Sequence, residues 1–122
     1  MDPEVPLKNA NTILYCEKWP ETVAFYRDFL KLPITHTTDW FVEFHLVGTA
    51  YLSVARAARA TIKSSRGAGI TLALQVEDAD RAWRQFAELD PDLEPVRDHS
   101  WGARVFYLFD PEGHRIEIWS AG

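Results

Sequence analysis

The most constraining feature of the chain is a pattern of elements that occurs twice. An apolar run ends at Cys16 and a helical pattern follows it, and the same order recurs after an apolar run that ends at Val76. Three short extended stretches follow each helical pattern. Two copies of one pattern must form two copies of one unit, which fixes the architecture. The sequence therefore predicts two modules, each a strand, a helix and three strands.

Prolines mark both ends of the helix expected in the first module. Its first strand is expected over 11–16, and Pro20 suits the first turn of a helix, where a missing N–H costs nothing. Pro33 is expected to end that helix. The helix presents one apolar stripe at helical spacing. That stripe consists of Thr22, Phe25, Tyr26, Phe29 and Leu30, and the extended stretches after it are 34–38, 40–47 and 50–55.

The ends of the helix and strands are marked more clearly in the second module. Apolar and small or polar residues alternate over 70–76, which predicts a strand buried on one face. Asp78 is a good N-cap for the helix that follows, and Asp90-Pro91 ends it. A type I turn is predicted at Asp110-Pro111-Glu112-Gly113, with Asp first, Pro second and Gly fourth. The extended stretches after the helix are 94–97, 103–109 and 115–119.

These modules predict an α+β fold. A four-stranded sheet with one helix leaves its other face open, so we expect the two sheets to join as an open, curved, barrel-like sheet with a helix outside each half. A ligand would occupy the cleft inside. We expect residues 1–122 to form a single domain, with the first module at 10–55, a connection at 56–68 and the second module at 69–120.

Composition excludes several classes of function. A single cysteine, Cys16, leaves no partner for an internal disulfide and no cysteine-rich zinc site. The net charge of −5 and the absence of a basic stripe argue against nucleic acid, and no apolar run approaches the roughly 20 residues that span a membrane. The start of the chain lacks the features of a signal peptide, so we expect a cytoplasmic protein. An acidic chain with five tryptophans suits a cationic or flat aromatic ligand.

Two segments of the chain resemble a known superfamily. They are Phe25-Tyr26-Arg27 with Leu30-Lys31-Leu32-Pro33, and Trp101-Gly102 followed by the run from Asp110 to Glu117. Both are similar to segments of the vicinal oxygen chelate superfamily, which includes glyoxalase I, extradiol dioxygenases, and fosfomycin- and bleomycin-resistance proteins. The similarity covers nearly all of residues 10–120, although the family usually has glycine where Lys31 stands. The resemblance implies the paired-module fold and a homodimer.

The resemblance also implies four positions for metal ligands, usually His, Glu, His and Glu. They correspond here to Asn11, Ser53, Thr71 and Glu117, so only Glu117 is retained. One carboxylate with an amide and two hydroxyls offers too little charge for a tight Zn²⁺ or Fe²⁺ site, although a weak, water-rich Mg²⁺ site stays open as an alternative. We therefore expect no cofactor.

A chain without the metal ligands resembles the bleomycin-resistance branch, whose members hold a drug between aromatic rings without transforming it. The function that we favour is metal-independent sequestration of an aromatic or cationic compound, such as an antibiotic, in an aromatic-lined cleft. The partners expected are a small-molecule ligand and a second copy of the chain. The candidate ligand-binding residues are Trp40, Glu43, Tyr51, Trp101, Arg104, Glu117 and Trp119.

Several of these residues have a second interpretation. Glu117 could form a structural ion pair with Arg104 or Arg115 instead of meeting a cationic ligand, and the tryptophans could simply fill the core. Glu43 leaves the apolar side of its strand together with His45, toward the cleft or toward solvent, and such a pair could also serve acid–base chemistry.

Two other functions stay open. One is a metal-dependent lyase or dioxygenase of the glyoxalase type that uses Glu117 with unusual ligands such as His45. The other is an accessory domain whose cleft is vestigial. Whether the protein is an enzyme is therefore undecided by the sequence, with binding the favoured alternative.

Overall fold

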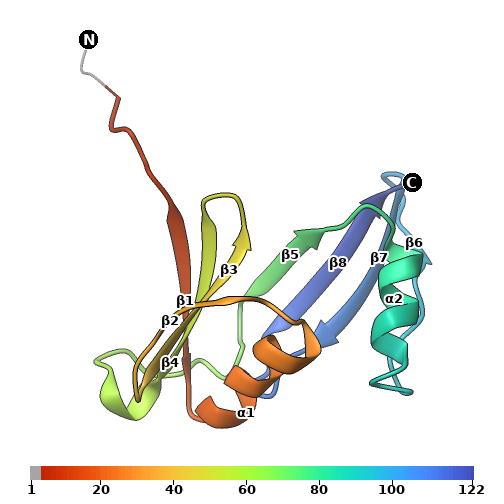
Figure 1. Ribbon diagram of the computed structural model, residues 1–122. Helices are drawn as coiled ribbons and strands as arrows, with labels where there is room; N and C mark the ends of the chain where they lie inside the picture. The colour runs from red at the N-terminus through yellow and green to blue at the C-terminus, as the bar shows by residue number, and fades with distance from the viewer. Residues whose placement is uncertain (1–3) are drawn as a thin grey trace. The chain divides into compact units, whose positions relative to one another are not determined.

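The computed structural model describes residues 4–122, which form two compact units divided between Ser64 and Ser65. The boundary between the units falls within the stretch 56–68 that the sequence marks as a connection. Each unit contains one four-stranded sheet and one helical segment packed on it (Figure 1).

The first unit has the predicted order of strand, helix and three strands. Its sheet has the strand order β1-β4-β3-β2, in which β1 runs parallel to β4 and the other pairs are antiparallel. The elements are β1 (Ala10–Cys16), α1 (Trp19–Ala24), η1 (Phe25–Phe29), β2 (Ile34–Thr37), β3 (Phe41–Val47), β4 (Ala50–Arg56) and η2 (Ala57–Arg59).

The first helix differs from the single α-helix that its apolar stripe predicts. It begins as α-helix and continues as the π-helical turn η1, where the Leu30 N–H donates to the Phe25 carbonyl at 3.1 Å. Lys31 then has a φ of 58°, in the left-handed region, and ends the helix before Pro33. Side-chain spacing alone does not distinguish a π-turn from the last turn of an α-helix.

This helical segment covers one face of the first sheet. Tyr26 is fully buried and lies against Phe44 of β3, with ring centroids 6.0 Å apart. The Trp19 indole donates to the Val54 carbonyl at 2.9 Å and fixes the start of the helix against β4. The other buried apolar residues on this side include Leu14, Cys16, Val23, Val42 and Leu52.

The second unit repeats the arrangement. Its sheet order is β5-β8-β7-β6, again with the first and last strands parallel and adjacent. The elements are β5 (Thr71–Gln75), α2 (Ala79–Ala87), β6 (Arg97–Asp98), β7 (Ala103–Phe109) and β8 (Arg115–Ala121). The βαβββ order and the α+β class are thus confirmed in both modules.

The extended stretch predicted over 94–97 is shorter in the structure and shifted toward the C-terminus. Only Arg97–Asp98 pairs with β7. The carbonyl of Glu94 instead accepts a hydrogen bond from the Trp83 indole of α2 at 2.7 Å. The stretch before β6 is therefore held by the helix and is not available to the sheet.

The turn between β7 and β8 is confirmed. The Gly113 N–H donates to the Asp110 carbonyl at 3.0 Å, which closes the turn. The Asp110 carboxylate accepts three backbone N–H bonds through Oδ1 and contacts His114 Nδ1 at 2.8 Å through Oδ2. Both side chains are buried, so this turn is a rigid corner that sets the register of the β7–β8 hairpin.

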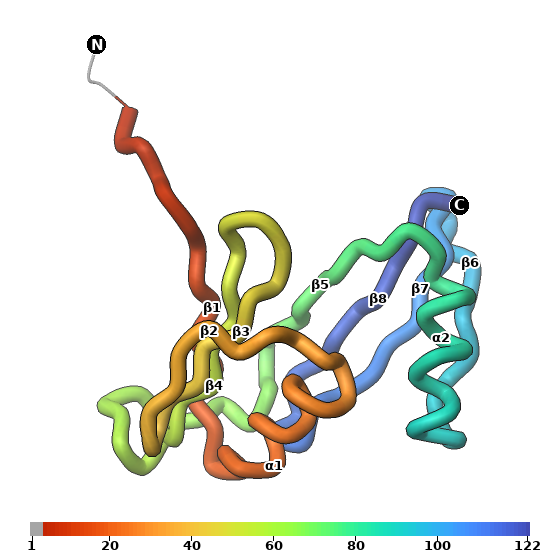
Figure 2. The backbone as a smooth tube through the Cα atoms, in the orientation of Figure 1, coloured from red at the N-terminus to blue at the C-terminus, as the bar shows by residue number. Residues whose placement is uncertain are grey.

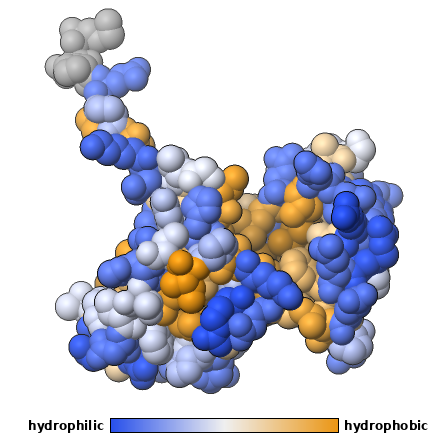
Figure 3. All heavy atoms as spheres, in the orientation of Figure 1, coloured by the Kyte–Doolittle hydropathy of each residue, from blue (hydrophilic) through white to orange (hydrophobic). Residues whose placement is uncertain are grey.

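Residues 4–9 form an extended, exposed arm that runs away from the first sheet (Figures 1 and 2). Val5 and Leu7 in this arm are largely solvent-exposed. On the side in view in Figure 3, patches of hydrophobic surface also occur on each unit among hydrophilic surface. Among the described residues, neither helix has the length and hydrophobicity that a membrane crossing requires.

Candidate functional site

The helix-free face of the second sheet carries three of the seven candidate residues, Trp101, Glu117 and Trp119. Helix α2 lies on the opposite face, where Phe86 meets Phe106 of β7 with ring centroids 6.3 Å apart. Alternation along the strands therefore directs Tyr107, Glu117 and Trp119 to the helix-free face. Tyr107 is paired directly with Glu117 across the β7–β8 ladder.

Four aromatic side chains gather at one end of this face. Trp101 packs edge-on against Trp119 with ring centroids 5.4 Å apart. Its indole N–H donates to Nδ1 of His99 at 3.1 Å, and Nε2 of His99 lies 3.2 Å from the Tyr107 hydroxyl. We call Trp101, Trp119, His99 and Tyr107 the aromatic cluster. Trp101 remains 58% exposed, so its ring is accessible to a ligand.

Glu117 lies within reach of this cluster and is unusual among the acidic residues. It is half-buried, with Tyr107 opposite it on β7 and Ala73 opposite it on β5. No residue of 4–122 forms a hydrogen bond or ion pair with its carboxylate. A half-buried carboxylate without a partner favours a cation, because burial weakens its hydration.

Neither arginine that could have neutralised Glu117 does so. The Arg115 guanidinium donates from Nε to the Thr71 hydroxyl at 3.0 Å and lies over the Tyr107 ring, 5.0 Å from its centroid. The face therefore offers a cation at one end and a carboxylate in the middle. The ion pair of Glu117 with Arg104 or Arg115, one of its two interpretations, is therefore not formed among residues 4–122.

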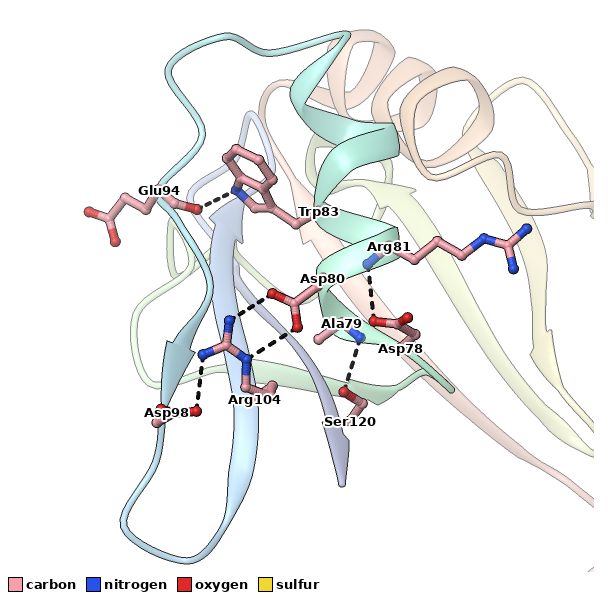
Figure 4. A network of polar contacts seen from close by, with 9 residues as sticks. All are labelled: Asp78, Ala79, Asp80, Arg81, Trp83, Glu94, Asp98, Arg104 and Ser120. Atoms are coloured by element: carbon pink, nitrogen blue, oxygen red, sulfur yellow. Dashed lines mark hydrogen bonds and ion pairs between the residues drawn. The ribbon is translucent and has the colours of Figure 1, made fainter. Parts of the chain in front are cut away.

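Arg104 lies on the other face of the sheet, which corrects its expected place beside Glu117. It donates to both carboxylate oxygens of Asp80 at 2.7 and 3.2 Å, and to Asp98 at 3.0 Å (Figure 4). These hydrogen bonds raise the pKa of Arg104 and lower the pKa of Asp80. Arg104 thus anchors the start of α2, and its guanidinium is turned away from the face that carries Glu117.

Glu43 lies on the helix-free face of the first sheet. Its carboxylate accepts from the Thr35 hydroxyl at 2.8 Å and from the Asn11 amide at 3.4 Å. The Asn11 oxygen in turn accepts from the Ser53 hydroxyl at 2.9 Å. Glu43 thus lies with Asn11 and Ser53 on this face, within a polar network of the unit itself.

The other two candidates of the first unit lie at opposite ends of the same face. Tyr51 lies beside His45, with ring centroids 5.4 Å apart, and Nε2 of His45 is 2.8 Å from the Gly48 carbonyl oxygen. Trp40 is half-buried at the start of β3 and lines a cavity described below. The structure therefore separates Trp40 from Tyr51 along the strands.

The positions of the family's metal ligands do not fit a metal. In the first unit the Asn11 and Ser53 side chains hydrogen-bond to each other. In the second unit the Thr71 hydroxyl accepts from the Arg115 guanidinium, which places a positive charge beside a would-be ligand. Across residues 4–122, no three His, Cys, Asp or Glu side chains gather where they could hold an ion.

Two members of the aromatic cluster, His99 and Tyr107, are absent from the sequence-based candidates. Tyr107 was detectable, because the predicted turn and strand lengths pair it with Glu117. His99 carries no such signal, since it lies in the turn between β6 and β7 and its role depends on where Trp101 folds back.

Comparison with known proteins supports the fold. The model of the Glyoxalase/Bleomycin resistance protein/Dioxygenase superfamily matches residues 10–118. No curated protein matches the chain.

Solved structures with the same fold come from several bacteria. A glyoxalase/bleomycin resistance protein/dioxygenase from Nocardioides has a TM-score of 0.75 and 19% identity, over 98% of this chain and 86% of that one. Lactoylglutathione lyase from Agrobacterium tumefaciens has a TM-score of 0.73 and 22% identity, over 97% and 95%. A glyoxalase/bleomycin resistance protein from Catenulispora acidiphila has a TM-score of 0.72 and 19% identity, over 93% and 98%. At these identities the likeness concerns the fold alone.

Proposed function

Since the chain belongs to the glyoxalase/bleomycin resistance protein/dioxygenase superfamily, we propose that it is a metal-independent protein that sequesters a small aromatic or cationic compound, such as an antibiotic of the bleomycin type. The observation that carries the proposal is the carboxylate of Glu117. It has no partner among residues 4–122 and lies on the same face as the aromatic cluster. Binding and release need no tuned acid or base.

The proposed ligand combines a flat ring with a positive charge. Its ring would stack on the exposed face of Trp101 beside Trp119, and its charge would be directed toward Glu117. A cation over an aromatic face contributes roughly 0.5–2 kcal/mol, more when water is excluded. The net charge of −5 adds a long-range attraction for such a ligand.

The candidate residues of the first unit differ in how freely they could bind a ligand. Glu43 has internal hydrogen bonds to Asn11 and Thr35, so its charge is partly satisfied before any ligand arrives. Tyr51 and Trp40 offer ring faces on the helix-free side of their sheet. We also propose a homodimer, for which analytical ultracentrifugation is the direct measurement.

Intrinsic fluorescence tests the proposal, because two of the five tryptophans belong to the aromatic cluster. We expect metal-free bleomycin to quench the emission of the wild-type protein in a saturable way. Trp101→Phe should lose much of that response. Trp83→Phe is the matched control, since the Trp83 indole is bound to the Glu94 carbonyl and lies outside the cluster.

A flat titration to millimolar ligand would rule out the bleomycin version of the proposal. An equal response in Trp101→Phe and wild type would rule out the aromatic cluster as the binding surface.

A further inference from the structure

The first unit contains a cavity of about 330 Å³ at the end of its sheet where β3 begins. It is formed entirely by residues of that unit, from β1, β3, β4 and the segment that follows β4. Its volume lies at the lower end of the range of small-molecule sites. The lining residues are Ile13, Tyr15, Trp40, Phe41, Ala55, Arg59, Ala60 and Thr61.

Three of the eight residues that line this cavity are aromatic. Trp40 and Phe41 lie with ring centroids 5.5 Å apart and planes inclined by 62°, so together they form a corner instead of a closed stack. Tyr15 contributes a third ring. Neither the Trp40 indole N–H nor the Tyr15 hydroxyl has a hydrogen-bond partner among the described residues, which leaves two polar groups for a ligand.

Arg59 is the one charged residue that lines the cavity. Its only described ion pair is a single contact between Nη1 and Asp39 Oδ2 at 3.3 Å, and both side chains are largely exposed, at 54% and 76%. Such a pair contributes little, because water screens it and only one N–H is used. A planar carboxylate could bind the same guanidinium through two parallel hydrogen bonds.

We propose that this cavity binds a planar aromatic carboxylate, with its ring between Trp40 and Tyr15 and its carboxylate on Arg59. This inference goes beyond the proposed function, since its ligand has the opposite charge and binds Arg59 instead of Glu117. The ligand replaces Asp39 on Arg59 and covers aromatic surface that is otherwise in contact with water.

The probe for this site is 2-naphthoate, and its neutral counterpart is 2-naphthamide. Calorimetric titration of the wild-type protein should detect naphthoate. Arg59→Gln should weaken naphthoate binding at least about tenfold, because a charge-assisted hydrogen bond is lost. The amide should bind both proteins equally weakly. Lys63→Gln is the matched control, since it removes one positive charge from the same exposed segment outside the cavity.

A second variant predicts a gain of affinity. Asp39→Asn removes the carboxylate that competes for Arg59, so naphthoate should bind up to about fivefold tighter, in line with the strength of an exposed ion pair. This result cannot come from a damaged fold, which would only weaken binding.

Indole N–H signals in a ¹H–¹⁵N spectrum, assigned by single Trp→Phe variants, locate the ligand. Naphthoate should shift the Trp40 signal and leave Trp101 in place. Undetectable binding at millimolar naphthoate, or equal binding by wild type and Arg59→Gln, would overturn the inference. Neither outcome tests Glu117, so the proposed cation site is supported or ruled out by its own experiments.

Discussion

Lys31 adopts a left-handed backbone conformation, with a φ of 58°, directly after Leu30, the C-cap of the first helical segment. Helices commonly end in this conformation on glycine, because a side chain beyond Cα crowds the backbone there. The segment Leu30-Lys31-Leu32-Pro33 thus keeps the geometry of a glycine cap without the glycine. Its lysine side chain is exposed and is not needed for the core.

Lys31→Gly is therefore expected to stabilise the protein. Glycine relieves the backbone strain at this position, and that gain exceeds the loss caused by the greater conformational freedom of the unfolded chain. The free energy of unfolding should therefore rise by roughly 0.5–1 kcal/mol. Chemical denaturation measures the change. Lys31→Ala is the control, since it removes the same side chain but keeps the Cβ. An equal gain in both variants would show that backbone strain is not the cause.

Which residues share a face could be predicted from the sequence only in part. Glu117 lies between Ile116 and Ile118 in the strand, so alternation predicts that its side chain points to the face opposite theirs. The prediction that Arg104 shares a face with Glu117 is wrong, because residues 105–109 of β7 are apolar or aromatic on both faces, which removes the contrast that alternation needs. The side-chain network of Glu43 likewise depends on β2, whose register with β3 shifts between Ile34 and His36.

At the scale of elements, hydrogen bonds hold the first turn of α2 in place. Asp78 caps the helix by accepting from the Arg81 N–H at 3.1 Å, and the Ala79 N–H donates to the Ser120 hydroxyl at 2.9 Å (Figure 4). Asp80 binds Arg104 of β7. The cap thus closes the helix end, and the other two contacts join its first turn to β8 and β7.

Asp78→Ala is expected to lower the free energy of unfolding by about 1 kcal/mol, the usual loss for a removed N-cap. Denaturant titration provides the value. Asp78→Asn retains an acceptor and should cost much less. If the two variants were equally destabilised, the cap would not be the source of the effect.

The ion pair of Asp80 predicts a dependence on pH. Hydrogen bonds from Arg104 lower the pKa of Asp80 in the folded protein below its ordinary value of 3.8. A lowered pKa stabilises the fold above the unfolded-state value and ceases to do so as the pH falls through the folded-state value. The stability difference between wild type and Asp80→Asn should therefore be constant near neutral pH and shrink below pH 3.8.

Melting curves across this pH range check the prediction, with Asp92→Asn as a control on an exposed loop. A difference that grew as the pH fell would contradict the ion pair.

The order and positions of the elements were largely predictable. Strand 103–109 agrees with β7 at both ends, because apolar content and the Asp110 turn bound it. The π-turn η1 and the two-residue strand β6 could not be predicted from the sequence, since both depend on tertiary contacts. For η1 the contact is the burial of Tyr26, and for β6 it is the Trp83–Glu94 hydrogen bond.

At the scale of the whole chain, the two units share one pairing scheme. Ser53 pairs with Ile13 on β1, and Glu117 pairs with Ala73 on β5, so Ser53 and Glu117 occupy the same position in the two repeats. The first copy fills this position with a neutral, buried hydroxyl bonded to Asn11. The second keeps a carboxylate. The repeats therefore retain one fold while they differ in charge at this position of the helix-free face.

This difference predicts how the protein behaves toward metals. Protein purified without chelators should contain far less than one equivalent of zinc, iron or manganese, because the family positions supply one carboxylate, two hydroxyls and an amide. Elemental analysis by mass spectrometry measures the content. Stoichiometric metal would favour the lyase or dioxygenase alternative.

The central claim is that Glu117 serves an organic cation and not a metal ion. Calorimetric titration of chelator-treated wild type and Glu117→Gln with 1-naphthylmethylammonium tests it most directly. The account predicts saturable binding by wild type, unchanged by the chelator and about tenfold weaker in Glu117→Gln. Equal affinity in the two proteins, or binding that disappears when metals are removed, would contradict it.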